Sequence, residues 1–289
     1  MTQKHKKKKI LITGSAGFTG RYLTNLLTPN ASLELTLADH TAKAPDPRFR
    51  ACDLSDASLT AKLLKATAPD AVYHLVGSYT NEYETDYTSN VVTTKNILDA
   101  VRESGMKTRI LLVGSSAEYG FPQKASIAVT EDHPCKPVSV YGLMKLFQTE
   151  LMGTYTRLYG MDIVAVRPFN LSGKGISPTL FVGKMEQEIA KYKRGEIKEI
   201  ITGDLSVERD YIDIEEAIKY YRVVMEKGET GEIYNVGNGK PISLFKVLKN
   251  MLAKEGLSMD IVRESTHHVP GKMVVPKIFA DISKLKQLT

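Results

Sequence analysis

The stretch Ile10-Leu-Ile-Thr-Gly-Ser-Ala-Gly-Phe-Thr-Gly20 decides the fold of this chain. A short apolar run is followed by three glycines spaced three residues apart, and an amphipathic stretch from Arg21 to Leu27 comes next. The order of strand, glycine turn and helix is the context in which a glycine pattern indicates dinucleotide binding. The stretch therefore predicts the first βα unit of a doubly wound α/β fold.

Each glycine has its own predicted role. Gly14 permits a tight turn, Gly17 lets the backbone approach a pyrophosphate, and Gly20 lets the helix pack closely on the strand. The helix N-terminus, where Phe18 and Thr19 stand, offers free N–H groups to phosphate oxygens. The spacing G-x-x-G-x-x-G differs from the common G-x-G-x-x-G, so a glycine-rich turn without a ligand is the alternative.

The strand predicted at residues 33–38 is followed by Asp39. An acidic residue at this point accepts hydrogen bonds from ribose hydroxyls and repels a 2′-phosphate, which favours NAD(H) over NADP(H). Three basic residues nearby weaken that preference and keep NADP(H) as an alternative: Lys43, Arg48 and Arg50.

The composition fits one large α/β domain with a smaller lobe, since the chain has 289 residues, 42% of them apolar and 25% charged. Removing the five lysines between Lys4 and Lys9 takes the net charge from +6 to +1. A nearly neutral body argues against a nucleic-acid enzyme with a broad basic face. Residues 1–9 are expected to form a solvated basic tail, with a localisation or polyanion-binding signal as the alternative.

The cysteines and the hydropathy favour a cytoplasmic protein. Cys52 and Cys135 have no metal-ligand spacing and suggest no disulfide framework. No apolar run approaches the ~20 residues of a membrane span. The apolar run that begins at Ile10 is too short for a signal peptide. We therefore expect a soluble protein without a structural metal or a membrane partner.

Two further buried strands are predicted at residues 71–77 and 109–114. His74 lies inside the first, where a histidine is more often a satisfied core residue than a base, so we assign it no catalytic role. The second strand delivers Ser115 and Ser116 to the carboxyl edge of the sheet, where open α/β sheets bind their ligands.

Tyr141 and Lys145 stand four residues apart, which places both on one face of a predicted helix. A nearby ammonium favours phenolate over phenol, so the lysine is predicted to lower the tyrosine pKa from its usual value near 10. A tyrosine tuned in this way exchanges a proton with a carbonyl or alcohol oxygen near neutral pH. By itself this spacing is weak, because many helices carry it on a solvated face.

Four signals follow one another along the chain: the glycine loop, His-Leu-Val-Gly at 74–77, Ser-Ser-Ala-Glu-Tyr-Gly at 115–120, and Tyr141-x-x-x-Lys145. Together they resemble the extended short-chain dehydrogenases/reductases that act on nucleotide sugars, over nearly the whole chain. This resemblance implies a Rossmann-type doubly wound parallel sheet with a small C-terminal substrate-binding lobe. It also implies that Ser115 hydrogen-bonds the substrate oxygen, with Ser116 as the alternative. Tyr141 would exchange the proton, and Lys145 would also hold the nicotinamide ribose.

The same resemblance assigns further cofactor contacts. In this family an Asp-Leu pair at the position of Asp53 and Leu54 contacts the adenine. The alternative is that Asp53 only stands at a helix N-terminus, where backbone N–H groups satisfy its carboxylate. A helix expected at about 83–104 carries an asparagine that supports the active-site lysine. The cofactor residues implied in this way are Asp53, Leu54, Leu75, Val76, Gly77, Asn90 and Pro168.

The serine segment separates reactions within the family. Sugar-nucleotide 4,6-dehydratases carry Thr-x-Glu where this chain has Ser115-Ser116-Ala117. That glutamate removes a proton during dehydration, and alanine has no proton to exchange. Glu118 is one residue further on and is expected to point elsewhere, so a dehydratase is disfavoured.

The second half is expected to contain the substrate lobe. We place residues 10–171 in the NAD(P)-binding domain, with later segments returning to it, and residues 172–289 mainly in the lobe. The family's Arg-Asp-Phe-x-Asp segment binds the nucleotide diphosphate through its arginine, which corresponds here to Arg209. Asn170 is expected to reach the substrate. Lys184 is a candidate for the diphosphate, or a solvated helix residue.

The segment from Arg167 to Pro178 resembles GDP-4-keto-6-deoxy-mannose reductases more closely than galactose epimerases, although Leu171 stands where those reductases usually have a histidine. The resemblance implies that NAD(P)H reduces a nucleotide-linked 4-keto-6-deoxy sugar, with GDP as the favoured nucleotide. A nucleotide-sugar 4-epimerase with tightly held NAD is the main alternative, and a non-enzymatic dinucleotide sensor is the other.

Assembly and the C-terminus complete the expectations. The family resemblance implies a homodimer formed through helices near 83–104 and 140–158. Relatives usually continue beyond a Ser-Lys-Leu segment with a Gly-Trp-x-Pro turn and a closing helix, whereas this sequence stops at Thr289. The lobe is therefore expected to lack a closing helix, and a relative with altered activity is an alternative.

Overall fold

The computed structural model describes residues 6–41, 45–265 and 273–289. Its centre is a seven-stranded sheet in the order β10-β6-β5-β4-β1-β2-β3, in which every neighbouring pair is parallel. The predicted α/β fold with a parallel sheet is thus confirmed. The strands of this sheet are β1 (Lys8–Thr13), β2 (Leu33–Asp39), β3 (Phe49–Ala51), β4 (Ala71–His74), β5 (Arg109–Val113), β6 (Ile163–Pro168) and β10 (Ile233–Val236).

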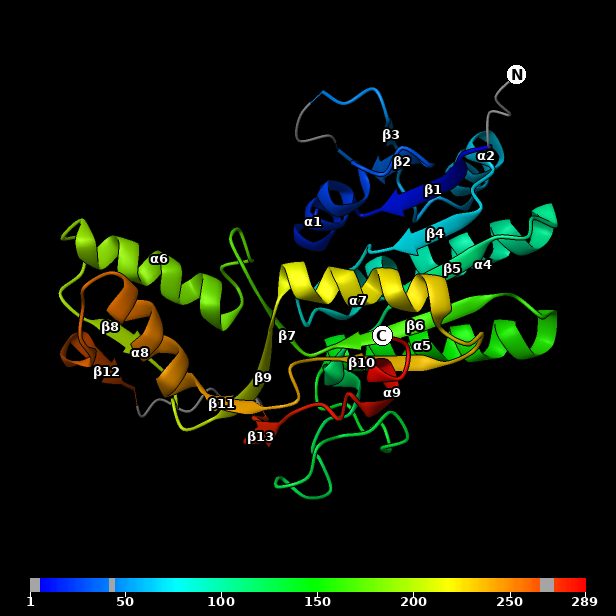
Figure 1. Cartoon of the computed structure of the whole chain (residues 1–289). Coiled ribbons are helices and arrows are strands. Elements are labelled where there is room, and N and C mark those ends of the chain that lie inside the picture. Colours follow the sequence, from blue (N-terminus) through cyan, green and yellow to red (C-terminus); the bar gives the residue numbers. More distant parts are fainter. Residues whose placement is uncertain (1–5, 42–44, 266–272) are drawn as a thin grey trace.

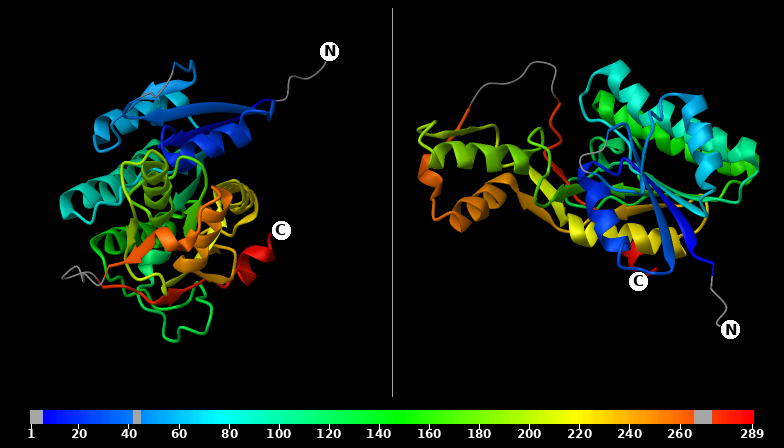
Figure 2. Two further views of the ribbon diagram at one scale, coloured as in Figure 1. Left: turned by 90° about the vertical axis from the view of Figure 1, so that its left-hand side faces the viewer. Right: turned by 90° about the horizontal axis from the view of Figure 1, so that it is seen from above.

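Helices cover both faces of the sheet (Figure 2, right). One face carries α1 (Phe18–Leu27) and α7 (Ile214–Lys227), and the other carries α2 (Ala57–Thr67), α4 (Thr93–Ser104) and α5 (Val140–Tyr159). Strands buried on both faces read as continuous apolar runs, and all six residues of β6 are buried. Two separate apolar cores result, one on each side of the sheet.

A smaller lobe extends from the carboxyl edge of the sheet (Figure 1, left). It contains α6 (Phe181–Lys193) and α8 (Leu244–Lys254), which pack around their own apolar cluster. The pair β8 (Ile200–Thr202) and β12 (Val262–Glu264) lies beside them. A four-stranded sheet connects the lobe to the main body and consists of β7 (Asn170–Ser172), β9 (Glu208–Asp213), β11 (Pro241–Ser243) and β13 (Lys277–Ile278).

The basic tail is shorter than expected. Residues 1–9 were assigned to it from the sequence, but Lys8 and Lys9 are the first residues of β1 and pair with Leu33 and Glu34 of β2. Pairing with the neighbouring strand extends the sheet beyond the apolar run. Residues 1–5 lie outside the described residues.

The helix expected at 83–104 is divided. The five-residue helix α3 (Tyr83–Tyr87) leads into a π-helical turn, η1 (Thr88–Val92), and α4 continues from there. The side chain of Asn90 donates to the carbonyl of Asp86 at 2.8 Å and to that of Ser78 at 3.1 Å. These contacts accompany the wider turn, and single π turns of this kind are frequent at functional sites.

The C-terminus does form a short helix, α9 (Ser283–Lys286), although it packs against the main body rather than the lobe. Leu285 is fully buried in the core beneath α7, and the C-terminal end of the chain lies beside β10 (Figure 1). The ammonium of Lys227 donates to the carbonyl of Leu288 at 2.7 Å. Within the described ranges, no helix is both long and apolar enough to cross a membrane.

Candidate active site

The glycine loop has the geometry that its spacing predicts. Gly14 has φ +67°, and a Cβ on it would stand 2.8 Å from the carbonyl carbon of Leu75. A Cβ on Gly20 would stand 2.3 Å from the carbonyl oxygen of Gly14. Glycine at these two positions therefore lets the loops after β1 and β4 touch and lets α1 approach the strand.

Gly17 is the N-cap of α1, and no side chain caps that helix. Its first N–H groups are consequently left for phosphate oxygens. Phe18 and Thr19 occupy the first turn, and the Phe18 ring packs edge-on against Tyr22. The loop therefore fits the pyrophosphate of a dinucleotide.

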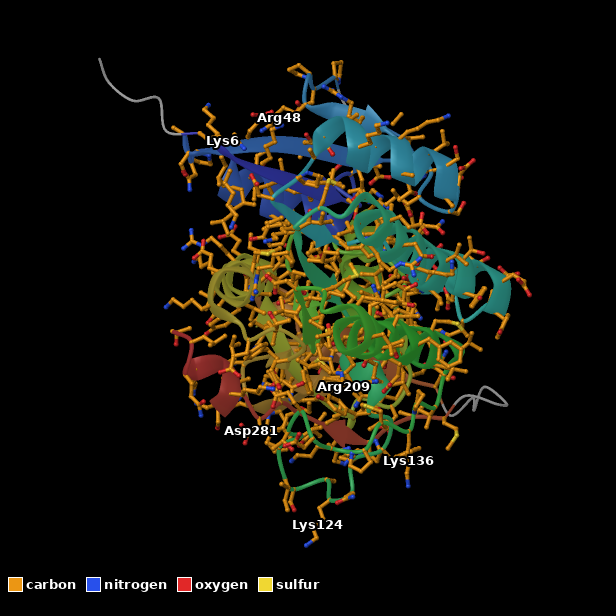
Figure 3. The ribbon with its side chains drawn as sticks, turned by 90° about the vertical axis from the view of Figure 1, so that its right-hand side faces the viewer. Lys6, Arg48, Lys124, Lys136, Arg209 and Asp281 are labelled. Carbon is orange, nitrogen blue, oxygen red and sulfur yellow. The ribbon has the colours of Figure 1, made fainter. Side chains whose placement is uncertain are left out.

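Asp39 ends β2 beside this loop, as predicted. Its Oδ2 accepts a hydrogen bond from the N–H of Ala16 at 3.0 Å, and the residue is 9% exposed. Arg48 is held by Asp46, with the Nη2–Oδ2 distance 2.7 Å, and lies at the end of the molecule opposite to Lys124 (Figure 3). Lys43 lies outside the described residues.

The next two predicted adenine contacts differ in exposure. Asp53 is exposed and accepts hydrogen bonds from the N–H and the hydroxyl of Ser55, at 2.9 and 2.7 Å. Leu54 is buried, and its carbonyl accepts from Asn96 at 2.9 Å. Asp56, and not Asp53, caps α2 by accepting from the N–H of Leu59.

Ser115 and Tyr141 meet at the carboxyl edge of the sheet. Burial raises the pKa of Tyr141 to about 12, and hydrogen bonding to the Ser115 side chain opposes that shift. Ser115 is itself 9% exposed, and its Oγ accepts from the N–H of Ala117 at 3.1 Å. Of the two candidate serines, Ser115 is the one whose side chain influences the Tyr141 hydroxyl.

The predicted lowering of the Tyr141 pKa by Lys145 is not what the structure gives. The Lys145 ammonium donates to the carbonyl of Val113 and to Oε1 of Gln148, both at 2.9 Å. Burial also lowers the pKa of Lys145 itself, to about 8, which weakens its influence on a neighbour. Desolvation determines the direction of the pKa shift for both Tyr141 and Lys145, and the spacing of the two residues on a helix does not reveal desolvation.

Asn90 and Lys145 converge on Gly77. A Cβ on Gly77 would stand 2.6 Å from Oδ1 of Asn90 and 3.0 Å from Nζ of Lys145. Asn90 is fully buried, and its Oδ1 has no hydrogen-bond partner among the described residues. An unused acceptor beside an ammonium suits a hydroxyl group, as a ribose would provide. Val76, the residue before Gly77, is partly buried against the α2–α4–α5 core.

The Glu118 carboxylate, which was expected to differ in direction from the dehydratase glutamate, is occupied by buried partners. The residue is fully buried, and its Oε2 pairs with Nε of Arg167 at 2.7 Å and accepts from the Thr149 hydroxyl at 2.9 Å. Its Oε1 accepts from the N–H of Ser115 at 2.7 Å. The carboxylate thus joins the end of β5, β6 and α5, and Arg167 serves this buried pair.

His74 is a core residue, as predicted. It is fully buried, and its ring nitrogens contact the hydroxyls of Thr13 at 2.8 Å and Thr94 at 3.1 Å. Burial lowers the pKa of His74 to about 3, and the charge of Lys145 acts in the same direction. A histidine held neutral in this way is a poor proton acceptor.

The residues from the second half approach the same edge. Pro168 is buried at the end of β6, and Nδ2 of Asn170 donates to the carbonyl of Asp210 at 3.2 Å. The Asp210 side chain accepts three backbone N–H groups and so orders the loops that carry them, and Asp213 caps α7. Lys184 is exposed on α6.

Arg209 is half-buried on β9, and its guanidinium donates to the carbonyl of Glu208 at 2.8 Å. Burial lowers the pKa of Arg209, and the hydroxyls of Tyr211 and Tyr79 oppose this effect. Tyr79 also packs edge-on against the Tyr141 ring, with 4.8 Å between the ring centroids. Tyr79 therefore packs on the predicted proton donor, and its hydroxyl opposes the lowering of the pKa of the predicted phosphate anchor.

One residue of this site was not found from the sequence. Asp86 is fully buried in α3 and fixes the loop that carries Tyr79. It stands in a stretch that was expected to be an uninterrupted helix, and no local pattern marks it. An acidic residue in the first turn of a short helix usually signals only the helix N-terminus.

The chain is similar to characterised and solved proteins. It is 26% identical over 263 residues to GDP-6-deoxy-D-mannose reductase of Pseudomonas aeruginosa, covering 89% of this chain and 83% of that protein. It is 28% identical over 292 residues to a putative UDP-glucose 4-epimerase of Methanocaldococcus jannaschii, covering 96% and 92%. A structure of RMD from Pseudomonas aeruginosa in complex with NADPH superposes with a TM-score of 0.84 at 22% identity, covering 98% and 91%.

The family model matches residues 10–237, which is well over half of the chain. This range includes the glycine loop, the Ser115 segment, Tyr141 and Lys145. The protein therefore belongs to the NAD dependent epimerase/dehydratase family and is an NAD(P)-dependent enzyme that modifies nucleotide sugars.

Proposed function

We propose that the protein reduces the 4-keto group of a nucleotide-linked 4-keto-6-deoxy sugar, with a GDP-linked sugar as the first candidate. The observation that carries this proposal is the meeting of Ser115 and Tyr141 at the sheet edge, with alanine at position 117. Glu118, the nearest carboxylate in sequence, is committed to Arg167. Tyr141 can thus donate a proton to a carbonyl, whereas position 117 offers no carboxylate for dehydration and Glu118 is held in an ion pair.

The residues act on the carbonyl oxygen. Burial keeps Tyr141 protonated at neutral pH, because its pKa is raised to about 12, and a protonated phenol suits a donor. Ser115 donates a hydrogen bond to the same oxygen and stabilises the charge that develops there. Lys145 supplies positive charge beside Gly77 whenever it is protonated. The bound dinucleotide would supply the hydride.

The cofactor contacts follow the loops of the sheet edge. Residues Gly14, Gly17, Phe18, Thr19 and Gly20 would bind the pyrophosphate. Asp39 would accept from the adenosine ribose, which favours NAD(H), with NADP(H) as the alternative. The remaining contacts would come from Asp53, Leu54, Leu75, Val76, Gly77, Asn90, Tyr141, Lys145 and Pro168.

The nucleotide sugar would bind between the sheet edge and the lobe. Arg209 would hold the diphosphate, because a planar guanidinium matches phosphate oxygens. Asn170 and Ser116 would contact the sugar, and Lys184 would extend the phosphate contacts. The 26% identity to the GDP-6-deoxy-D-mannose reductase of Pseudomonas aeruginosa supports the choice of nucleotide and sugar.

A 4-epimerase is the second candidate, because the identity to the Methanocaldococcus relative is similar and covers more of the chain. It would use the same residues and return the hydride to the opposite face of the sugar. NAD that stays bound through purification favours the epimerase, whereas free exchange with added NADH favours the reductase. A dinucleotide sensor would have no use for the Ser115–Tyr141 pair.

We propose a homodimer formed through α5 and the segment 83–104, which contains α3, η1 and α4. Phe147, Leu158 and Tyr159 are exposed on α5, at 41%, 67% and 47%. A groove of about 290 Å³ between η1 and α5 is lined by Tyr87, Val91, Phe147, Glu150, Leu151 and Thr154. Covering this apolar surface is the simplest role for a second copy.

The test is NADH oxidation with a panel of GDP-, dTDP- and UDP-linked 4-keto-6-deoxy sugars, run beside Tyr141→Phe. We expect turnover on one nucleotide class and a loss of about 10²-fold or more in the variant. NAD(H) binding by the variant, measured by calorimetry, should stay close to wild type. Turnover that survives in Tyr141→Phe would contradict the assignment of the proton donor.

A further inference from the structure

Asp86 accepts four hydrogen bonds from one short loop. The donors are the hydroxyl of Ser78 at 2.7 Å, the N–H and the hydroxyl of Thr80 at 3.0 and 2.9 Å, and the N–H of Asn81 at 2.8 Å. Asp86 has no exposed surface. Burial opposes its ionisation, but these hydrogen bonds outweigh burial and hold the pKa of Asp86 below its ordinary value. The loop is therefore wrapped around a buried carboxylate, which stays charged at neutral pH.

The loop carries two contacts to Tyr141. The Tyr79 ring meets the Tyr141 ring edge-on, with 4.8 Å between the centroids. Asn81 has a left-handed backbone, with φ 61°, and its Oδ1 accepts from the N–H of Tyr141 at 3.4 Å. Asparagine tolerates this conformation better than most non-glycine residues, and hydrogen bonds to its neighbours hold the loop in this shape. Asp86 supplies that support through the N–H groups of Thr80 and Asn81.

Asn90 holds the loop from its other end. Its amide donates to the carbonyls of Ser78 and Asp86, at 3.1 and 2.8 Å. The π turn η1 begins between Asp86 and Asn90 and lets both side chains face the same loop. The same asparagine presents its free Oδ1 toward Gly77, beside Lys145. One short segment of chain thus reaches both Tyr141 and Lys145.

We propose that Asp86 is a positioning residue of this active site, which fixes the 78–81 loop so that Tyr79 holds the phenol of Tyr141 in the orientation needed for proton transfer. The expected effect on kcat rests on the proposed function, whereas the expected effect on the 78–81 loop does not. Proton transfer requires the donor within hydrogen-bond reach of its partner, so a small displacement of Tyr141 is costly.

The kinetic test is a double-mutant cycle of Asp86→Ala and Tyr79→Ala in the full-length protein. Each variant is expected to lower kcat by about 10- to 100-fold. If Asp86 acts through Tyr79, the double variant should be about as slow as the slower single variant. Tyr79→Phe retains the ring that packs on Tyr141 and should recover most of the kcat that Tyr79→Ala loses. Multiplied losses in the double variant, or a folded Asp86→Ala with an unchanged kcat, would overturn the proposal.

Asp162→Ala is the control for loss of a hydrogen-bonded carboxylate far from the site, on a side chain that is 44% exposed. Truncation of Asp162 removes hydrogen bonds from Arg109 and Thr230, and Asp162 lies next to the amino end of β6, at the opposite edge of the sheet. It should lower thermal stability and leave kcat unchanged. If it lowers kcat as much as Asp86→Ala does, the effect of Asp86 is general destabilisation and the proposal fails.

Hydrogen exchange followed by mass spectrometry tests the structural part without any substrate. In Asp86→Ala, the amides of residues 78–82 and the first turn of α5 should exchange at least about tenfold faster, with the rest of α5 unchanged. Unchanged exchange in both segments would overturn the proposal. If the wild type turns over none of the sugars, the proposed reductase fails, while the exchange experiment still decides the role of Asp86.

Discussion

The backbone N–H of Ser115 donates a 2.7 Å hydrogen bond to Oε1 of Glu118, whose other oxygen pairs with Arg167. Both charged side chains are almost completely buried, at 0% and 3% exposure. Removing one partner of a buried ion pair leaves the other charge without compensation. Glu118→Gln should therefore lower the free energy of unfolding by about 3 kcal/mol or more in urea titrations.

Glu103→Gln is the control for that measurement, because Glu103 forms an exposed pair with Arg102. The control should leave the free energy of unfolding nearly unchanged. Equal destabilisation by both substitutions would show that burial of the Glu118–Arg167 pair does not determine the loss in the free energy of unfolding.

Gly77→Ala tests the convergence of Asn90 and Lys145. The new methyl group would meet Oδ1 of Asn90 at 2.6 Å and Nζ of Lys145 at 3.0 Å, so one of them must move. Turnover should fall about tenfold or more, since small displacements of catalytic groups are costly. Gly153→Ala on α5 would meet only the flexible guanidinium of Arg157 and should keep its activity. Full activity of Gly77→Ala would argue against a fixed ammonium at this point.

The buried Lys145 makes stability depend on pH in a defined window. Its pKa is about 8 in the folded state and is ordinarily 10.5. Between these values the unfolded chain binds more protons, so the free energy of unfolding rises with pH. The cost of burying the charge is complete below pH 8 and disappears above pH 10.5. Lys145→Met should lack this rise, and the difference between the two proteins should change by roughly 2–3 kcal/mol across the window.

Urea titrations at several pH values from 7 to 10.5 would measure that difference. Comparing the two proteins cancels the titration of groups that they share. A gap that is constant over this range would contradict the lowered pKa of Lys145.

Asp39 should determine the choice of cofactor. Asp39→Ala removes a carboxylate that would repel a 2′-phosphate, so the preference for NADH over NADPH should fall by about tenfold, or 1.4 kcal/mol. The ratio of kcat/KM for the two cofactors measures it. Asp56→Asn is the control, because asparagine also caps a helix well and Asp56 faces the start of α2. An unchanged ratio in Asp39→Ala would place cofactor selection elsewhere.

Arg209 should act on one substrate only. Arg209→Lys keeps the charge but loses the planar fork, so KM for the nucleotide sugar should rise about tenfold while KM for NADH stays constant. Arg263→Lys, an exposed change on β12 beside Glu199, should affect neither value. A parallel rise of both KM values would show that Arg209 supports the fold of the site rather than the diphosphate.

The sequence predicted the parallel sheet because its strands are continuous apolar runs that end in glycines or polar residues. Local patterns also marked the glycine loop, Asp39 and the Tyr141–Lys145 spacing as candidates for the site. His74 was correctly assigned to the core for the same reason, since an apolar strand buried on both faces surrounds it. Each of these inferences needed only residues that are close together along the chain.

The inferences that failed depended on contacts between distant residues. The predicted direction of the Tyr141 pKa shift was wrong, because desolvation dominates the shift and the helical neighbour Lys145 does not. The break in the helix at Thr88–Val92 was missed because Asn90 forms its contacts with Ser78 and Asp86. Asp86 was missed because its four hydrogen bonds come from a loop that folds back on it.

The edge strand β10 and the covering helix α7 have a consequence for the order of synthesis. β10 is the last strand of the sheet that begins with β1, and α7 covers that sheet. Both nevertheless follow α6 and the lobe strand β8 in the chain. A ribosome must therefore release residues up to about Val236 before β6 gains its outer neighbour. Until then the outer edge of β6 and the face that α7 covers stay open to other chains. Slow translation of residues 172–213 would prolong that interval and should favour aggregation of the nascent protein.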